Sequence, residues 1–230
     1  MNGSMLIAGS GPELVSALAD EAGRRGIKTA LSLIPGNNGR RRPMFSTATE
    51  RIVPLDWNPC SPISARSLIL AAENKNGTVG SGIVVCAGAN GTEMRDFSPV
   101  GIDFVVNNHI KSYMFLAHEL TRSFRARQNG TLVFVLLEGQ SPDIMAAPVF
   151  SAFKSFSGSM LAQSNMEYLN TLAFSYEEKN IPKINEYAAY IFKTIEENKK
   201  TDRAGWFKFT KLKIRPPAGL IRGILETVHR

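Results

Sequence analysis

The sequence predicts an α/β fold, a single doubly wound domain whose parallel sheet has about seven strands with helices on both faces. Short apolar runs of strand length alternate with amphipathic segments of about a dozen residues or more, as in repeated βαβ units. Two of these runs, 82–88 and 131–137, are apolar throughout, which is typical of parallel strands buried on both faces. The length of 230 residues suits one domain, and 43% hydrophobic with 20% charged residues is a globular composition.

Each element follows from a local pattern. In the first helix the residues Leu14, Ala17, Leu18 and Ala22 share one face, and Gly26 ends the helix. The predicted strands are 5–8, 28–34, 51–55, 82–88, 131–137, 170–175 and 206–212. The predicted helices are 13–25, 61–74, 102–127, 148–167 and 182–198, with a short helix from Ala218. Because there is no internal repeat, residues 1–230 are interpreted as one domain with a basic C-terminal tail at about 213–230.

The chain is basic, with 27 Lys+Arg against 20 Asp+Glu, a net charge of +7 and a pI near 9.5. The charge gathers in 40–42 and in the C-terminal region after Lys199. Such clusters can attract nucleic acid, acidic membranes or a phosphorylated ligand, and a solvated face is the simpler interpretation. No zinc-finger, RNA-binding or helix-turn-helix signature accompanies them, so a nucleic-acid partner is not expected.

Several classes of protein are excluded by what the sequence lacks. No apolar run approaches the roughly 18 residues of a membrane span, and Met1 to Ile7 has no basic region of the kind that opens a signal peptide. Cys60 and Cys86 are the two cysteines, and Cys86 lies in an apolar strand, so we expect a reducing cytoplasmic location. No histidine has the spacing of a metal site, and no G-x-S-x-G elbow of a serine hydrolase is present.

The loop Gly9-Ser10-Gly11 lies between the first strand and the first helix. Glycines at this place let the backbone approach a pyrophosphate at the helix N-terminus. The G-x-G-x-x-G pattern is incomplete, because Leu14 stands where its last glycine would be. Glu13 suits the helix dipole but repels a phosphate bound at the same amides. A tight turn between strand and helix is the alternative interpretation.

Three further positions are candidates for ligand binding. Asp56 follows the third strand, where an adenine could lie, although an aspartate after a strand is also a common cap or turn residue. Arg40 follows the second strand, where an arginine can pair with a 2′-phosphate, or can simply lie in a solvated loop. Asn108 lies among apolar residues of a long helix, which is unfavourable for an amide unless it has partners.

Phe150 and Lys154 are four residues apart and would project from one face of a helix. With the preceding motifs, this segment makes residues 5–212 resemble the short-chain dehydrogenase/reductase family. Residues 8–15 lie where that family has T-G-x-x-x-G-I-G, residues 55–56 resemble its adenine-binding aspartate, and residues 85–88 take the place of N-N-A-G. Asn108 falls near the family's helix asparagine, which supports a proton-relay water.

The resemblance implies a Rossmann-type fold that binds NAD or NADP, with the arginine of the 40–42 loop favouring NADP. It implies catalytic roles for Lys154 and Asn108. The cofactor-binding residues that it implies are Gly9, Ser10, Gly11, Arg40, Asp56, Ala87, Gly88 and Lys154.

Two departures from the family pattern bear on activity. Phe150 stands where the family has the tyrosine that acts as general acid/base, and Leu137 stands where it has a serine. The proline-glycine that would contact a nicotinamide is also missing from 171–176. The first hypothesis is therefore an inactive or weakly active relative with an impaired NAD(P) site. The alternatives are an atypical NAD(P)-dependent oxidoreductase acting on a small carbonyl or alcohol, with its acid from elsewhere (Tyr113 or Tyr176), and an interaction protein on a Rossmann scaffold.

Assembly is the last expectation. Helices 102–127 and 148–167 correspond to those through which the resembled family forms dimers and tetramers, and both carry more apolar residues than one buried stripe requires. We expect a homodimer or homotetramer, with core packing as the alternative explanation. The residues in question are Tyr113, Met114, Phe115, Leu116, Phe153, Phe156, Met160 and Leu161.

Overall fold

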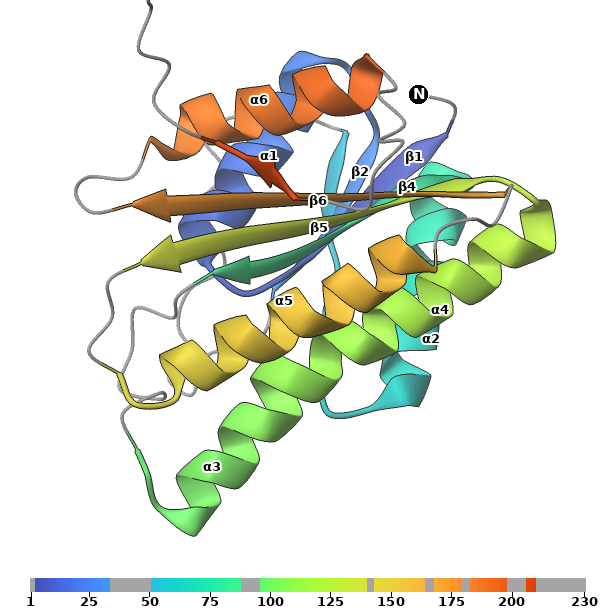
Figure 1. Cartoon of the computed structure of the whole chain (residues 1–230). Helices are drawn as coiled ribbons and strands as arrows, with labels where there is room; N and C mark the ends of the chain where they lie inside the picture. Colours follow the sequence, from blue (N-terminus) through green and yellow to red (C-terminus); the bar gives the residue numbers. More distant parts are fainter. Residues whose placement is uncertain are drawn as a thin grey trace, which may run out of the picture.

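The fold is a seven-stranded, wholly parallel sheet with helices on both faces, as predicted from the sequence (Figure 1). The structure is a computed structural model and describes residues 3–33, 51–87, 96–139, 143–163, 168–178, 183–197 and 206–209. The strands are β1 (Ser4–Gly9), β2 (Thr29–Leu33), β3 (Ile52–Pro54), β4 (Val79–Ala87), β5 (Gly130–Gly139), β6 (Leu169–Glu178) and β7 (Phe207–Lys208). Their order across the sheet is β3-β2-β1-β4-β5-β6-β7.

The helices are α1 (Pro12–Arg24), α2 (Pro62–Asn76), α3 (Pro99–Val105), α4 (Ser112–Arg127), α5 (Ala146–Ala162) and α6 (Ile184–Glu196). Every predicted helix up to residue 198 is present, with ends that differ by a few residues. Ser61 caps α2, because its hydroxyl accepts the backbone N–H of Ser64 at 3.2 Å. The loop with Arg40, the residue Gly88 and the helix expected from Ala218 lie outside the described residues.

Helices α1 and α6 cover one face of the sheet, and α2, α4 and α5 cover the other (Figure 1). Because successive strand residues point to opposite faces, β5 contributes to both hydrophobic cores. Leu132, Phe134 and Leu136 pack with α4 and α5, whereas Val133 and Val135 pack with α1 and α6. The apolar run that predicted a doubly buried strand is therefore explained by burial on both sides.

The long helix predicted at 102–127 begins earlier, at Pro99, and contains a π-helical segment, Val106–Lys111, between α3 and α4. A π turn holds an extra residue, and such turns often occur at functional sites. Asn108 and His109 are buried within it, with 9% and 5% of their surface exposed. The helix thus turns two polar side chains inward beside the carboxyl ends of the strands, where ligands bind in folds of this type.

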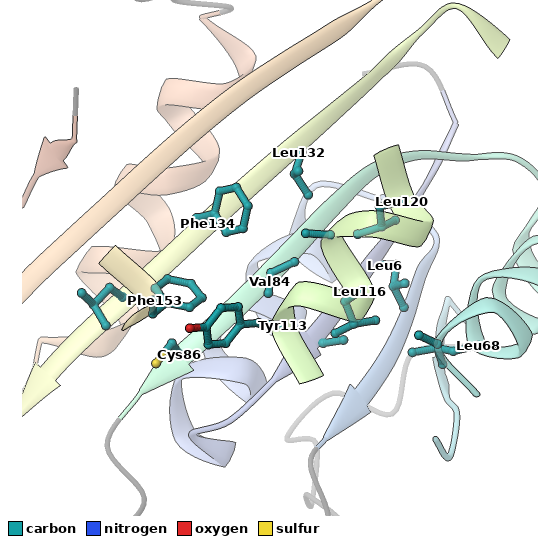
Figure 2. Packing of buried hydrophobic residues seen from close by; sticks show 14 of the residues in the cluster. Leu6, Leu68, Val84, Cys86, Tyr113, Leu116, Leu120, Leu132, Phe134 and Phe153 are labelled. Carbon is teal, nitrogen blue, oxygen red and sulfur yellow. The ribbon is translucent and has the colours of Figure 1, made fainter. Parts of the chain in front are cut away.

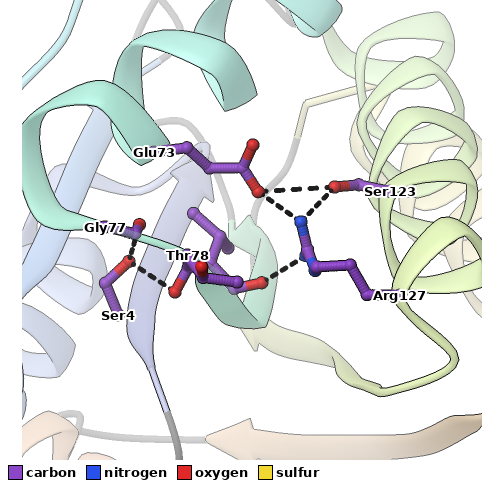
Figure 3. Close-up of polar contacts among 7 residues, drawn as sticks. Ser4, Glu73, Gly77, Thr78, Ser123 and Arg127 are labelled. Carbon is purple, nitrogen blue, oxygen red and sulfur yellow. Dashed lines mark hydrogen bonds and ion pairs between the residues drawn. The ribbon is translucent and has the colours of Figure 1, made fainter.

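The opposite, amino edge of the sheet is fixed by a polar network (Figure 3). The Arg127 guanidinium pairs with the Glu73 carboxylate and also donates to Ser123 Oγ at 2.8 Å and to the Val79 carbonyl at 2.7 Å. These contacts join α2, α4 and the start of β4. A guanidinium with fixed acceptors on three elements holds the helices in position against the sheet.

Among the described residues, no helix combines the length and apolar character that crossing a membrane requires.

Candidate functional site at the carboxyl edge of the sheet

The glycines of the first loop are required by close packing against β4. Gly9 and Gly11 have φ angles of +147° and +82°, in the region that favours glycine. A Cβ on Gly9 would lie 2.0 Å from the carbonyl oxygen of Val85, and one on Gly11 would lie 2.3 Å from the Cβ of Ala87. Packing alone therefore explains both glycines, whether or not a dinucleotide binds here.

Ser10 binds the backbone of β4 through both its hydroxyl and its N–H. Its hydroxyl donates to the Ala87 carbonyl and accepts the Ala87 N–H, each at 3.1 Å, and its own N–H donates to the Val85 carbonyl at 3.0 Å. Only 8% of the residue is exposed. The predicted cofactor residues Ser10 and Ala87 are thus neighbours, and they are engaged with each other.

The N-terminus of α1 is poorly suited to a pyrophosphate. Pro12, the first helical residue, has no N–H to offer, and Glu13 is exposed in the first turn with its negative charge. Val15 stands where the resembled T-G-x-x-x-G-I-G motif has its last glycine, and a side chain there could be expected to occupy the space of a phosphate. It is fully buried in the core on the α1 and α6 face, and therefore leaves that space free.

The side where an adenine would lie is more open. Asp56 is exposed just after β3 and makes no hydrogen bond with any part of the chain that the structure describes. Its neighbour Trp57 is 5% exposed, and within the described ranges its indole N–H has no acceptor. A buried donor of this kind is normally satisfied by water or a bound group. An exposed carboxylate and a buried indole N–H thus lie next to each other in the chain after β3.

Asn108 has partners at both ends of its amide. Its Nδ2 donates to the Phe104 carbonyl at 2.9 Å, and its Oδ1 accepts the Cys60 thiol at 3.5 Å. These bonds explain how an amide can be buried in the helix. They join the π-helical segment to the loop after β3, and no contact between Asn108 and Lys154 is found among the described residues.

Lys154 forms an ion pair with Glu138, the residue before the last one of β5. Its Nζ lies 2.7 Å from Oε1 and 2.8 Å from Oε2 of that carboxylate. The Lys154 side chain is 46% exposed and the Glu138 side chain 24% exposed, so the pair is accessible to solvent. One helical turn before the lysine, Phe150 is buried in the α4 and α5 core with 7% exposed.

Leu137 does not face this pair. It packs on the α1 and α6 face, so Glu138 is the residue that β5 presents to α5. Sequence reasoning set Glu138 aside because it searched the positions near Leu137 for a hydroxyl, which a glutamate lacks. The strand alternation could have identified it, since the polar residue that ends an apolar run faces the same way as Leu136.

Neither tyrosine that could replace the missing hydroxyl is placed to do so. Tyr176 packs on the far face, and its oxygen accepts the Lys183 N–H at 3.4 Å. Tyr113 packs edge-to-face on Phe153, with ring centroids 4.9 Å apart, and its hydroxyl lies toward Cys86 (Figure 2). Burial, and then the nearby Cys86, raise the pKa of Tyr113, the opposite of what a neighbouring ammonium would do.

Cys86 completes the buried side of the site. Burial, and then the Glu138 carboxylate, raise the pKa of its thiol, so the thiol stays protonated near neutral pH. No group of three His, Cys, Asp or Glu side chains that could hold a metal ion occurs among the described residues. Among the described residues, this part of the site therefore consists of the Lys154–Glu138 ion pair beside buried apolar side chains.

No protein-family model matches the chain, and no curated protein matches its sequence. Solved structures do resemble it. They include a short chain dehydrogenase from Mycobacterium smegmatis, with 16% identity, a TM-score of 0.73 and coverage of 92% of this chain and 93% of that one. A short chain dehydrogenase/reductase family oxidoreductase from Aeromonas hydrophila has 14% identity, a TM-score of 0.69 and coverage of 90% and 99%. Levodione reductase has 12% identity, a TM-score of 0.69 and coverage of 89% and 95%. At these identities the likeness is one of fold, and the chain has the fold of the short-chain dehydrogenases/reductases.

Proposed function

We propose that this protein is a divergent, catalytically silent or weakly active relative of the short-chain dehydrogenases/reductases. The observation that carries the proposal is the ion pair between Lys154 and both carboxylate oxygens of Glu138, one turn from the buried ring of Phe150. An ammonium that in the resembled family would assist a phenol instead neutralises a carboxylate here.

The proposal follows from the lack of a group that could donate a proton to the substrate oxygen. Hydride transfer to a carbonyl produces an alkoxide, and general acid help at that step is worth about 10²–10⁴-fold. Phe150 has no proton to give. The Glu138 carboxylate accepts hydrogen bonds, and its ion pair takes up the Lys154 charge that would otherwise stabilise the developing alkoxide.

A gain-of-function series tests the proposal. We expect Phe150→Tyr alone to show no robust reduction of generic ketones, because Glu138 still holds Lys154. The double variant Phe150→Tyr/Glu138→Ser frees the lysine and adds a hydroxyl, and should be the most active of the series. Phe150→Leu/Glu138→Ser is the matched control without a phenol. Substantial turnover by the unmodified protein would contradict the proposal, and turnover by Phe150→Tyr alone would indicate a recently silenced enzyme.

The same proposal includes weak dinucleotide binding. Glu13 and Pro12 weaken the phosphate end of the site, so the dissociation constant for NADH or NADPH should exceed about 100 μM. Fluorescence titration with each cofactor measures it. Glu13→Gln should tighten binding of both cofactors, whereas Arg40→Ala should weaken NADPH more than NADH. A sub-micromolar constant for the unmodified protein would favour an active oxidoreductase.

The second candidate function is an atypical NAD(P)-dependent oxidoreductase that oxidises a small alcohol. The specific observation in its favour is again Glu138, because a solvent-accessible carboxylate beside an ammonium can accept the proton of an alcohol. Glu138→Gln would then abolish alcohol oxidation while leaving cofactor affinity unchanged. The third hypothesis, an interaction protein that uses the Rossmann scaffold and the basic tail, predicts no turnover in any variant.

We further propose a homodimer or homotetramer built on α4 and α5, in a cytoplasmic protein whose two cysteines are free thiols. Of the apolar residues that suggested this assembly, Tyr113, Leu116, Phe153 and Leu161 are buried in the protomer's own core. Phe156 and Met160 are partly buried there, which leaves part of each for a partner. Light scattering should show a multiple of 25.2 kDa that Phe156→Glu splits, and a 25.2 kDa species at micromolar concentration would refute the assembly.

A further inference from the structure

Large apolar side chains are exposed at the carboxyl edge of the sheet, around the starts of α3 and α5. Phe97 is 60% exposed, Val100 78% and Ile144 54%. Phe97 and Val100 follow β4, whereas Ile144 follows β5. Because β4 and β5 are paired in parallel, both connections leave the sheet at the same edge (Figure 1). These three residues, named here the edge patch, have the exposed apolar character of an interaction site.

The C-terminal region of the chain starts from the same edge. β7 is parallel to β6 and therefore also ends at the carboxyl edge, and residues 210–230 lie outside the described ranges. Neighbouring strands are about 4.8 Å apart, so β4 lies about 14 Å from β7 across the sheet. Residues 210–217 can span up to about 26 Å when extended. The chain after them can therefore reach the edge patch of its own molecule.

The sequence of 218–228 suits an apolar surface of this size. Its apolar residues recur at the spacing of one helical face, and they are Leu220, Ile221, Ile224, Leu225 and Val228. A helix of this length would be about 16 Å long, close to the distance from β7 to β4. An amphipathic helix is stable when its apolar stripe is covered, and the edge patch offers such a cover.

The charges of the two partners are complementary. Residues 210–230 contain five Lys and Arg residues and one glutamate. The carboxyl edge carries the exposed carboxylates of Asp96, Asp103 and Glu177. Opposite charges at the rim of an apolar contact favour one partner and one orientation over others.

We infer that residues 218–230 dock on the edge patch of their own chain as an amphipathic helix. The docked helix crosses the carboxyl ends of β4 and β5, the edge at which ligands bind in folds of this type. The inference does not rest on the proposed function, because it concerns a contact within the chain and not the chemistry at Lys154. A second copy of the chain and an anionic membrane are the other occupants, of the patch and of the segment respectively, that an experiment must distinguish.

The test measures paramagnetic broadening of amide NMR signals in the full chain. A nitroxide is attached to Gly219→Cys, a position that the helical spacing places away from the apolar face, in a Cys60→Ser background. We expect strong broadening at Val100 and Ile144 and none at Gly77, at the far end of α2. Equal, weak broadening at all three residues would overturn the inference.

Mixing distinguishes the two copies of the chain. In a mixture of isotope-labelled chains without nitroxide and unlabelled chains with it, docking within one chain leaves Val100 and Ile144 unbroadened. Broadening in this mixture would assign the patch to a second copy. Sedimentation of the chain with phosphatidylserine vesicles, without broadening of Val100 in their absence, would assign the segment to a membrane surface. Either result would overturn docking within the chain.

Exposed positions of the patch allow variants that leave the core intact. Phe97→Ser/Val100→Ser should release the segment and raise the rate of tryptic cleavage after Arg222 about tenfold, because a docked site is cleaved only when it opens. Leu70→Ser is the matched control, since Leu70 is 50% exposed in the middle of α2 and outside the edge patch. It should leave the cleavage rate unchanged. Equal rates in the unmodified chain and the double variant would show that the segment does not dock on these residues.

Discussion

The first loop and helix α5 both retain residues of the resembled motif, but for different reasons. Gly9 and Gly11 remain where backbone packing against β4 excludes any side chain. Lys154 remains on an exposed helix face where packing imposes no such limit, and it has a carboxylate partner, Glu138. A retained residue therefore indicates function only where the fold would tolerate its loss. The glycines carry little functional information, whereas the lysine and its partner carry most of it.

The largest expected effect tests the first half of this comparison. Gly9→Ala places a Cβ 2.0 Å from the Val85 carbonyl oxygen at a φ of +147°, so neither the backbone nor the neighbour can relieve the contact. We expect the free energy of unfolding to fall by about 4 kcal/mol or more. Urea denaturation measures it.

The matched control is Gly158→Ala in α5, where a Cβ meets no atom within 4 Å. Because alanine favours the helix more than glycine does, Gly158→Ala should raise the free energy of unfolding by up to about 1 kcal/mol. If Gly9→Ala were equally benign, the loop would be adaptable, and its glycines would have to be explained by a ligand.

The next effect concerns the free energy of unfolding at alkaline pH, to which the buried Cys86 contributes. Burial raises the pKa of the Cys86 thiol, so the folded state holds its proton more tightly than the unfolded chain does. The resulting stability is complete below about pH 8.5, where a free cysteine titrates, and is lost as the pH rises further. At pH 10 this cysteine alone should lower the free energy of unfolding by about 2 kcal/mol. Cys86→Val should flatten the profile, whereas Cys60→Val, at an exposed position, should not.

Tyr113→Phe should have a smaller effect, and of the opposite sign to that of most core substitutions. The Tyr113 hydroxyl is buried and has no hydrogen-bond partner among the described residues, so its removal should leave stability unchanged or raise it by about 1 kcal/mol. Thermal unfolding measures this. A loss of stability, or of any measured turnover, would reveal a partner for the hydroxyl and return Tyr113 to the list of candidate acids.

The smallest expected effect tests the second region compared, the Lys154–Glu138 pair. Lys154 and Glu138 are partly exposed, so a double-mutant cycle with Lys154→Met and Glu138→Gln should give a coupling of at most about 1 kcal/mol. A coupling of this size means that the fold does not need the pair. A coupling of several kcal/mol would make Lys154 a structural residue, like the glycines, and would remove the distinction between the two regions.

The fold could be predicted from the sequence because the apolar runs and amphipathic helices alternate clearly, whereas parts of the site could not. The run 131–137 of β5 is apolar on both faces, so its pattern does not show which face meets α5, although alternation does place Leu137 and Glu138 on opposite faces. Asn108 meets Cys60 across 48 residues of sequence, a contact that no spacing rule predicts. β4 begins at Val79, earlier than predicted. The prediction missed this start because Gly80 and Ser81 do not indicate a strand.

The π-helical segment has a consequence for how the chain can change in length. Its extra residue is absorbed locally, so α3 and α4 both keep their buried faces toward the sheet. Deleting one residue within α3 or α4 would rotate one part of the helix against the other by about 100°. Deleting one within Val106–Lys111 could be absorbed by conversion to an ordinary α-helix. A one-residue deletion in this helix should therefore be tolerated best at one place, the turn that carries Asn108.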